Sequence, residues 1–70
     1  MIMQYVDSSN LLHIGYDANS QTLRIEFQNH TVYDYFDVPP HTYKGLMGAP
    51  SHGGYHARHI KDVYRYRRIL

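Results

Sequence analysis

The chain has 70 residues, no cysteine and a formal net charge of +1. This length fits one domain with one small core, and so thin a core leaves little volume for the enclosed pocket of an enzyme. The sequence therefore predicts a single domain over residues 1–70, with no catalytic activity and no small-molecule substrate.

The lack of cysteine excludes disulfides and thiolate zinc sites, which stabilise many small secreted domains. The first residues contain neither a basic leader nor an apolar stretch, and no apolar run is long enough to span a bilayer. These features predict a cytoplasmic protein that is neither exported nor embedded in a membrane.

Charged residues are distributed unevenly along the chain. Residues 1–56 carry two basic and five acidic side chains, a net charge of −3. Residues 57–70 carry five basic side chains and one acidic side chain, a net charge of +4. The asymmetry predicts a local positive field on a nearly neutral protein.

Apolar and polar residues alternate in the first half of the chain, which is the period of half-buried strands. Strands are expected at residues 11–17, 22–28 and 31–38. Tyr33 and Tyr35 would share one face of the third strand. Asn29 and His30 enter left-handed backbone conformations more readily than most residues, so they suit a turn before it.

Two short helices are expected next, at residues 40–48 and 51–62. Pro40 suits the first helical position, and Ser51 is the natural N-cap of the second helix. Lys61 would lie in the last turn, where its charge suits the negative end of the helix dipole.

The expected fold is α+β, a small antiparallel meander of three to four strands packed against two short helices. Residues 63–70 form either a further strand or an extended tail. The core is expected to include Leu12, Ile14, Leu23, Ile25, Phe27, Leu46 and Ile60.

Several short motifs occur in an order that resembles the KTSC domain family. They are Val6-Asp7-Ser8-Ser9, Ile14-Gly15-Tyr16-Asp17, Leu23-x-Ile25-x-Phe27, Tyr33-x-Tyr35, Val38-Pro39, Ala49-x-Ser51-x-Gly53 and Ile60. That family is named from its occurrence at the C-terminus of some lysyl-tRNA synthetases, and it also forms small bacterial and phage proteins. The resemblance implies an uncharacterised domain for which RNA binding has been suggested, and it implies no catalytic residue. The sequence departs from the family pattern at His30, where the turn usually has glycine, and at His56, where an aromatic residue is frequent.

Three histidines, His52, His56 and His59, fall near one face of the second expected helix, and histidines one turn apart can bind zinc. No carboxylate or cysteine accompanies them, and Gly53-Gly54 loosens the turn that would orient His52. The sequence predicts solvated or packed histidines, with no metal and no cofactor.

Tyrosine is abundant, with eight in the chain, and it serves either as half-buried core or as a surface for stacking bases. The C-terminal segment mixes tyrosines with cations, a composition that can neutralise phosphates and stack on unpaired bases. The alternative is a solvated charge run, with the tyrosines in the core. The candidate nucleic-acid-binding residues are Tyr33, Tyr35, Arg58, Lys61, Arg65, Tyr66, Arg67 and Arg68.

The favoured function is a non-catalytic accessory module that binds RNA, either tRNA-like or single-stranded. The alternative is a protein-protein interaction module or a homo-oligomerising domain, which would use an open sheet edge or an apolar helix face.

Overall fold

The computed structural model describes residues 1–70 and contains one antiparallel sheet whose strands lie in chain order. The strands are β1 (Gln4–Tyr5), β2 (Leu11–Asp17), β3 (Thr22–Phe27), β4 (Val32–Tyr35) and β5 (Tyr66–Arg68). The predicted α+β class and the antiparallel meander are confirmed. The sheet has five strands because two short edge strands flank the meander, and β1 was not predicted.

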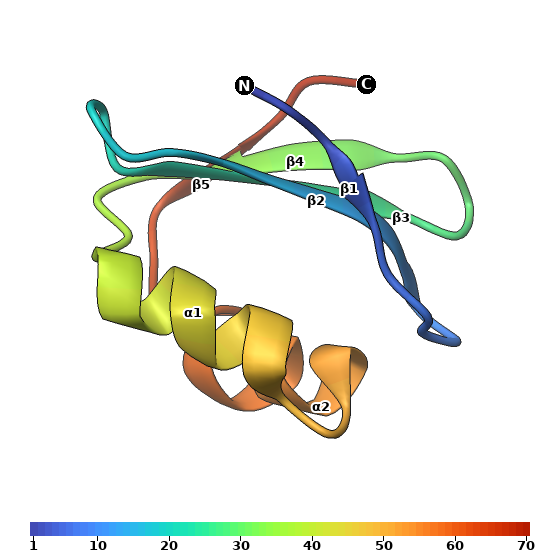
Figure 1. The fold of residues 1–70 in the computed structure, drawn as a ribbon. Helices are drawn as coiled ribbons and strands as arrows, with labels where there is room; N and C mark the ends of the chain where they lie inside the picture. Colours follow the sequence, from blue (N-terminus) through green and yellow to red (C-terminus); the bar gives the residue numbers. More distant parts are fainter.

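Two helices, α1 (Pro40–Gly48) and α2 (His52–His59), lie on one side of the sheet, and both chain ends lie on the other side (Figure 1). Pro40 occupies the first turn of α1, and the Oγ of Ser51 accepts a hydrogen bond from the amide of Gly54 at 3.0 Å. Both helices therefore begin where the sequence predicted, at Pro40 and after the Ser51 cap. Neither helix is long and apolar enough to cross a membrane.

Helix α2 ends three residues earlier than predicted. The amides of Ile60 and Lys61 both donate to the carbonyl of His56, at 3.1 and 2.8 Å, which closes the last turn. Asp62 then takes a φ of 62°, and the chain leaves the helix. The predicted place of Lys61 in the helix was therefore wrong.

The core lies between the sheet and the helices. Its fully buried side chains are Leu11, Ile14, Leu23, Ile25, Val38, Leu46 and Ile60. Five of the seven predicted core residues are among them, and Phe27 packs against the core while partly buried.

The prediction of Leu12 as a core residue was wrong, because the strand contains a β-bulge. The pairing of β2 with β3 shifts between Leu11 and His13, so Leu12 has no partner on β3. Leu11 and Ile14 are consequently both fully buried although they are three residues apart, and Leu12 is only half-buried. The prediction assumed strict alternation of buried and exposed residues along the strand, and the bulge interrupts that alternation.

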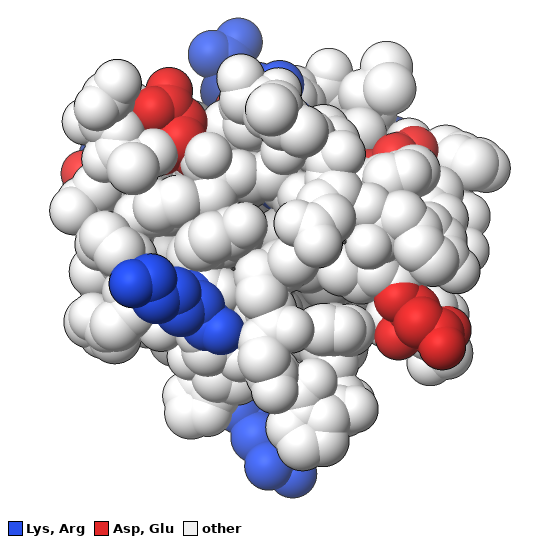
Figure 2. Space-filling model, viewed as in Figure 1, with Lys and Arg blue, Asp and Glu red and all other residues white.

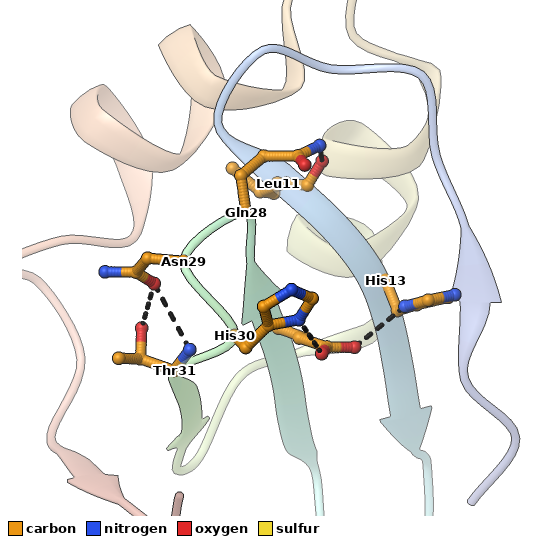
Figure 3. Close-up of polar contacts among 7 residues, drawn as sticks. Leu11, His13, Gln28, Asn29, His30 and Thr31 are labelled. Atoms are coloured by element: carbon orange, nitrogen blue, oxygen red, sulfur yellow. Dashed lines mark hydrogen bonds and ion pairs between the residues drawn. The ribbon is translucent and has the colours of Figure 1, made fainter.

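The turn between β3 and β4 is held by side chains (Figure 3). His30 adopts a φ of 67°, the left-handed conformation that few non-glycine residues take. The Oδ1 of Asn29 accepts hydrogen bonds from the amide and the hydroxyl of Thr31, at 3.2 and 2.7 Å. The Nδ1 atoms of His13 and His30 lie 2.8 and 3.3 Å from opposite oxygens of the Glu26 carboxylate. Glu26 thus joins this turn to the neighbouring strand β2.

Candidate nucleic-acid interface

The pairing of β4 with β5 brings three tyrosines onto the helix-facing side of the sheet. Tyr35 pairs with Tyr66, and Tyr33 pairs with Arg68. Tyr33 also pairs with the buried Ile25 of β3. Directly paired residues of antiparallel strands direct their side chains to the same face, so all of these side chains share the face that the helices cover.

Five aromatic rings gather on this face along strands β3, β4 and β5, where His56 of α2 packs against them. This aromatic cluster consists of Phe27, Tyr33, Tyr35, His56 and Tyr66. The centroids of Phe27 and His56 are 5.2 Å apart, and those of Tyr35 and Tyr66 are 6.0 Å apart. Tyr35 is only 5% exposed, whereas Tyr66 is 56% exposed. The cluster therefore has a buried base and an open ring at the edge strand.

A buried hydrogen bond of 2.9 Å joins the hydroxyl of Tyr35 to Nε2 of His56. Burial raises the pKa of Tyr35 to about 12. Burial also lowers the pKa of His56 below its ordinary value of 6.5, and the positive charge of Lys61 lowers it further. Near neutral pH both groups are therefore uncharged.

A hollow of about 530 Å³ lies beside the aromatic cluster, which forms its apolar wall. Its polar rim consists of Asn10, Gln28, Asn29, Thr31, Lys61 and Asp62. The volume falls within the range of small-molecule and cofactor pockets, about 300 to 1,000 Å³. The lining thus combines exposed aromatic surface, on which unpaired bases can stack, with a rim of six polar residues.

The structure divides the predicted site. Tyr33, Tyr35, Lys61 and Tyr66 line this one hollow, whereas the four arginines do not. Arg68 lies across from Tyr33 in the sheet, and its Nε donates to the carbonyl of Leu70 at 3.2 Å.

The other arginines point to separate places. Arg65 lies 5.2 Å from the ring centre of Phe36 and 3.7 Å from the carboxylate of Asp37. Arg67 pairs with Asp34 on the opposite face of the sheet, and Arg58 lies on α2. Figure 2 shows basic side chains as separate groups among uncharged ones on the face that it views. Proximity in sequence therefore did not translate into one basic surface.

Seven lining residues were not predicted as site residues. They are Asn10, Phe27, Gln28, Asn29, Thr31, His56 and Asp62. They come from four separate stretches of the chain, which only the sheet register and the packing of α2 bring together. The repeated Tyr-x-Tyr at 33–35 and 64–66 was the available signal, since its members Tyr35 and Tyr66 are paired in the sheet.

The three histidines near α2 have separate partners. The Nδ1 of His52 lies 2.8 Å from the carbonyl oxygen of Leu46, and His56 bonds to Tyr35. The ring of His59 lies 4.5 Å from that of Tyr55. The structure contains no group of three or more histidine, cysteine or acidic side chains placed to hold a metal ion.

The molecule is thus a small α+β domain with an aromatic hollow lined by residues of strands β3, β4 and β5 and of helix α2. Comparison with known proteins shows which family it belongs to. The KTSC domain family matches residues 7–64. The chain belongs to the KTSC domain family, which confirms the resemblance seen in its sequence.

Two relatives are lysine–tRNA ligases of cyanobacteria. The ligase of Nostoc punctiforme is 35% identical over 63 residues, and that of Trichormus variabilis is 39% identical over 63 residues. Each match covers 90% of this chain but only 11% of the ligase. The chain therefore corresponds to a small part of these enzymes.

Other relatives are about as short as this chain. An uncharacterized protein of Stutzerimonas stutzeri is 39% identical over 69 residues, which covers 91% of this chain and 92% of that protein. A crystal structure of a KTSC domain protein from Yersinia pestis superposes with a TM-score of 0.96 at 35% identity, covering 99% of this chain and 97% of that one. The domain thus occurs both within ligases and as nearly the whole of smaller proteins.

Proposed function

We propose that this domain is a non-catalytic module that binds single-stranded RNA at the aromatic hollow. The observation that carries the proposal is the ring of Tyr66, which lines the hollow beside Tyr33 and is largely exposed. Aromatic rings on a sheet surface provide stacking platforms for unpaired bases, worth about 1 to 3 kcal/mol per base.

Two cations, Lys61 and Arg68, support this function, while Asp62 is the one acidic side chain of the rim. Lys61 lines the hollow and forms no ion pair, so its ammonium group is available to a phosphate. Arg68 lies across from Tyr33 on the same strand pair. We expect Arg58 and Arg67 to contribute less, because they lie away from the hollow. The presence of related sequence in lysine–tRNA ligases, whose name states that they act on tRNA, also favours an RNA ligand.

The proposal is tested by titrating short single-stranded RNA at several salt concentrations. The affinity should fall as salt rises, and Lys61→Gln should reduce the slope of log affinity against log salt by roughly 0.7 to 1. Lys44→Gln is the matched control, because Lys44 is exposed on α1 and does not line the hollow.

Stacking is tested separately on the same RNA. Tyr66→Ala should weaken binding by about 1 to 3 kcal/mol, and Tyr66→Phe should retain most of it. Tyr5→Ala is the control, since Tyr5 is 63% exposed on β1 at the other edge of the sheet. Wild-type protein without salt-dependent affinity for RNA would overturn the proposal and leave the protein-interaction alternative.

A further inference from the structure

The hollow combines an aromatic wall with two opposite charges on its rim. Its apolar wall is made of flat rings, and its rim carries one cation and one anion, Lys61 and Asp62. Resting on the proposed function, we infer that the hollow is a subsite for one unpaired base and that it selects guanine.

The rim side chains differ in how many of their hydrogen-bond donors and acceptors are free to bind a ligand. The Nε2 of Gln28 already donates to the carbonyls of Ser8 and Leu11, at 3.0 and 3.1 Å. The Oδ1 of Asn29 already accepts two hydrogen bonds from Thr31. Neither side chain has its full hydrogen-bonding capacity free, so neither can read a base edge with both its donor and its acceptor.

The two charged rim groups, Lys61 and Asp62, are in contrast uncommitted. Both side chains are exposed, and neither forms an ion pair or a side-chain hydrogen bond. They follow the last turn of α2, where Asp62 takes a φ of 62°. The hollow therefore presents a free ammonium group and a free carboxylate on adjacent residues.

Guanine is the base that complements such a carboxylate. Its N1–H and its exocyclic amino group lie side by side, so one carboxylate can accept both hydrogen bonds, and the ammonium group of Lys61 stays available to a phosphate. Adenine and cytosine offer only an amino group as donor on their pairing edges, and uracil offers one N–H between two carbonyls. A carboxylate can therefore form its paired hydrogen bonds with guanine alone.

The stacking side of the subsite is independent of the base. Tyr66 and Tyr33, with ring centroids 5.8 Å apart, offer π surfaces to any base. Binding strength and base choice thus depend on different residues, and variants can separate them.

The experiment uses RNAs of about eight nucleotides, all uridine except for one central position that is G, A, C or U. Wild-type protein should bind the G-containing RNA about tenfold more tightly than the other three, the effect expected of one well-formed bidentate contact. Asp62→Asn should remove this preference, because the carboxylate is lost while asparagine tolerates the left-handed turn.

Asp37→Asn is the matched control, because Asp37 is also exposed and also has a positive φ, 57°, but does not line the hollow. It should keep the preference for G. Thermal melts of all variants show whether each is folded.

Salt-dependent binding without base preference, or with preference for another base, would overturn the inference and leave the proposed function intact. A preference for G that Asp62→Asn retains would also overturn it, because the carboxylate would not be the reading group. No binding to any of the RNAs would overturn both.

Discussion

Tyr35 and His56 form a buried hydrogen bond of 2.9 Å that joins strand β4 to helix α2 beneath the aromatic hollow. Both side chains are nearly inaccessible, at 5% and 7% exposure. A buried polar atom that loses its partner pays the full cost of its desolvation, whereas removal of both partners avoids that cost.

We therefore expect strong coupling between the two residues. Tyr35→Phe and His56→Phe should each destabilise the domain by about 1 to 3 kcal/mol. The double variant should lose clearly less than the sum, as measured by urea unfolding in a double-mutant cycle. Strictly additive losses would show that the hydrogen bond contributes nothing.

The same histidine should make stability depend on pH. Its pKa in the folded protein lies below the ordinary value of 6.5, because of burial and then of the charge on Lys61. As pH falls below about 6.5 the unfolded chain binds a proton that the folded protein does not, so the folded state loses stability until its own lower pKa is reached. Above that window this contribution is constant.

The measurement compares urea unfolding of wild type and His56→Phe between pH 5 and 8. Contributions from the other histidines cancel in the difference between the two proteins. We expect wild type to lose more stability than the variant on acidification. Parallel curves would contradict the expectation.

Leu11 and Leu12 should differ sharply although they are neighbours. Leu11→Ala removes a fully buried side chain and should cost about 2 to 5 kcal/mol, enough to unfold much of so small a domain. Leu12→Ala changes a half-buried residue at the bulge and should cost about 1 kcal/mol or less. Equal losses would contradict the observed register.

Asp34 in strand β4 and Asp37 just after it should differ in what their carboxylates contribute to stability. Asp34 is buried and receives two hydrogen bonds from Arg24, at 2.7 and 2.9 Å, whereas Asp37 is exposed and lies 3.7 Å from Arg65. Asp34→Asn should cost about 1 to 3 kcal/mol, and Asp37→Asn should stay within about 0.5 kcal/mol. Unfolding midpoints of the two variants measure the difference, and equal midpoints would contradict it.

Much of the fold could be predicted because its signals are local. Strand β2, the limits of α1 and the Ser51 cap follow from alternation, proline and a hydroxyl at the right position. Strand β1 could not be found this way, since Gln4 and Tyr5 are both exposed and only their pairing with β2 makes them a strand.

The candidate site was predictable only in part, because strand pairing and helix packing bring together residues that are distant in sequence. Tyr66 and Lys61 could be selected by residue type, but Asn10 and Asp62 reach the same hollow through strand register and helix packing. The arginines were grouped by their proximity in sequence, yet neighbouring residues of a strand point to opposite faces, which separates Arg67 from Arg68.

The bulge at Leu12 also determines where the chain can be shortened. Deleting a residue inside a regular strand moves every following side chain to the wrong face, so deletion of Arg24 should prevent folding. Deletion of Leu12 removes the residue that has no partner on β3, and Leu11 and Ile14 would then stand two apart on the face they already share. The main loss is the carbonyl of Leu12, which accepts from the amide of Val6 at 3.1 Å and would have to be replaced by a neighbour. The strand should therefore tolerate loss of a residue at position 12, so that the chain lacking Leu12 folds and the chain lacking Arg24 does not.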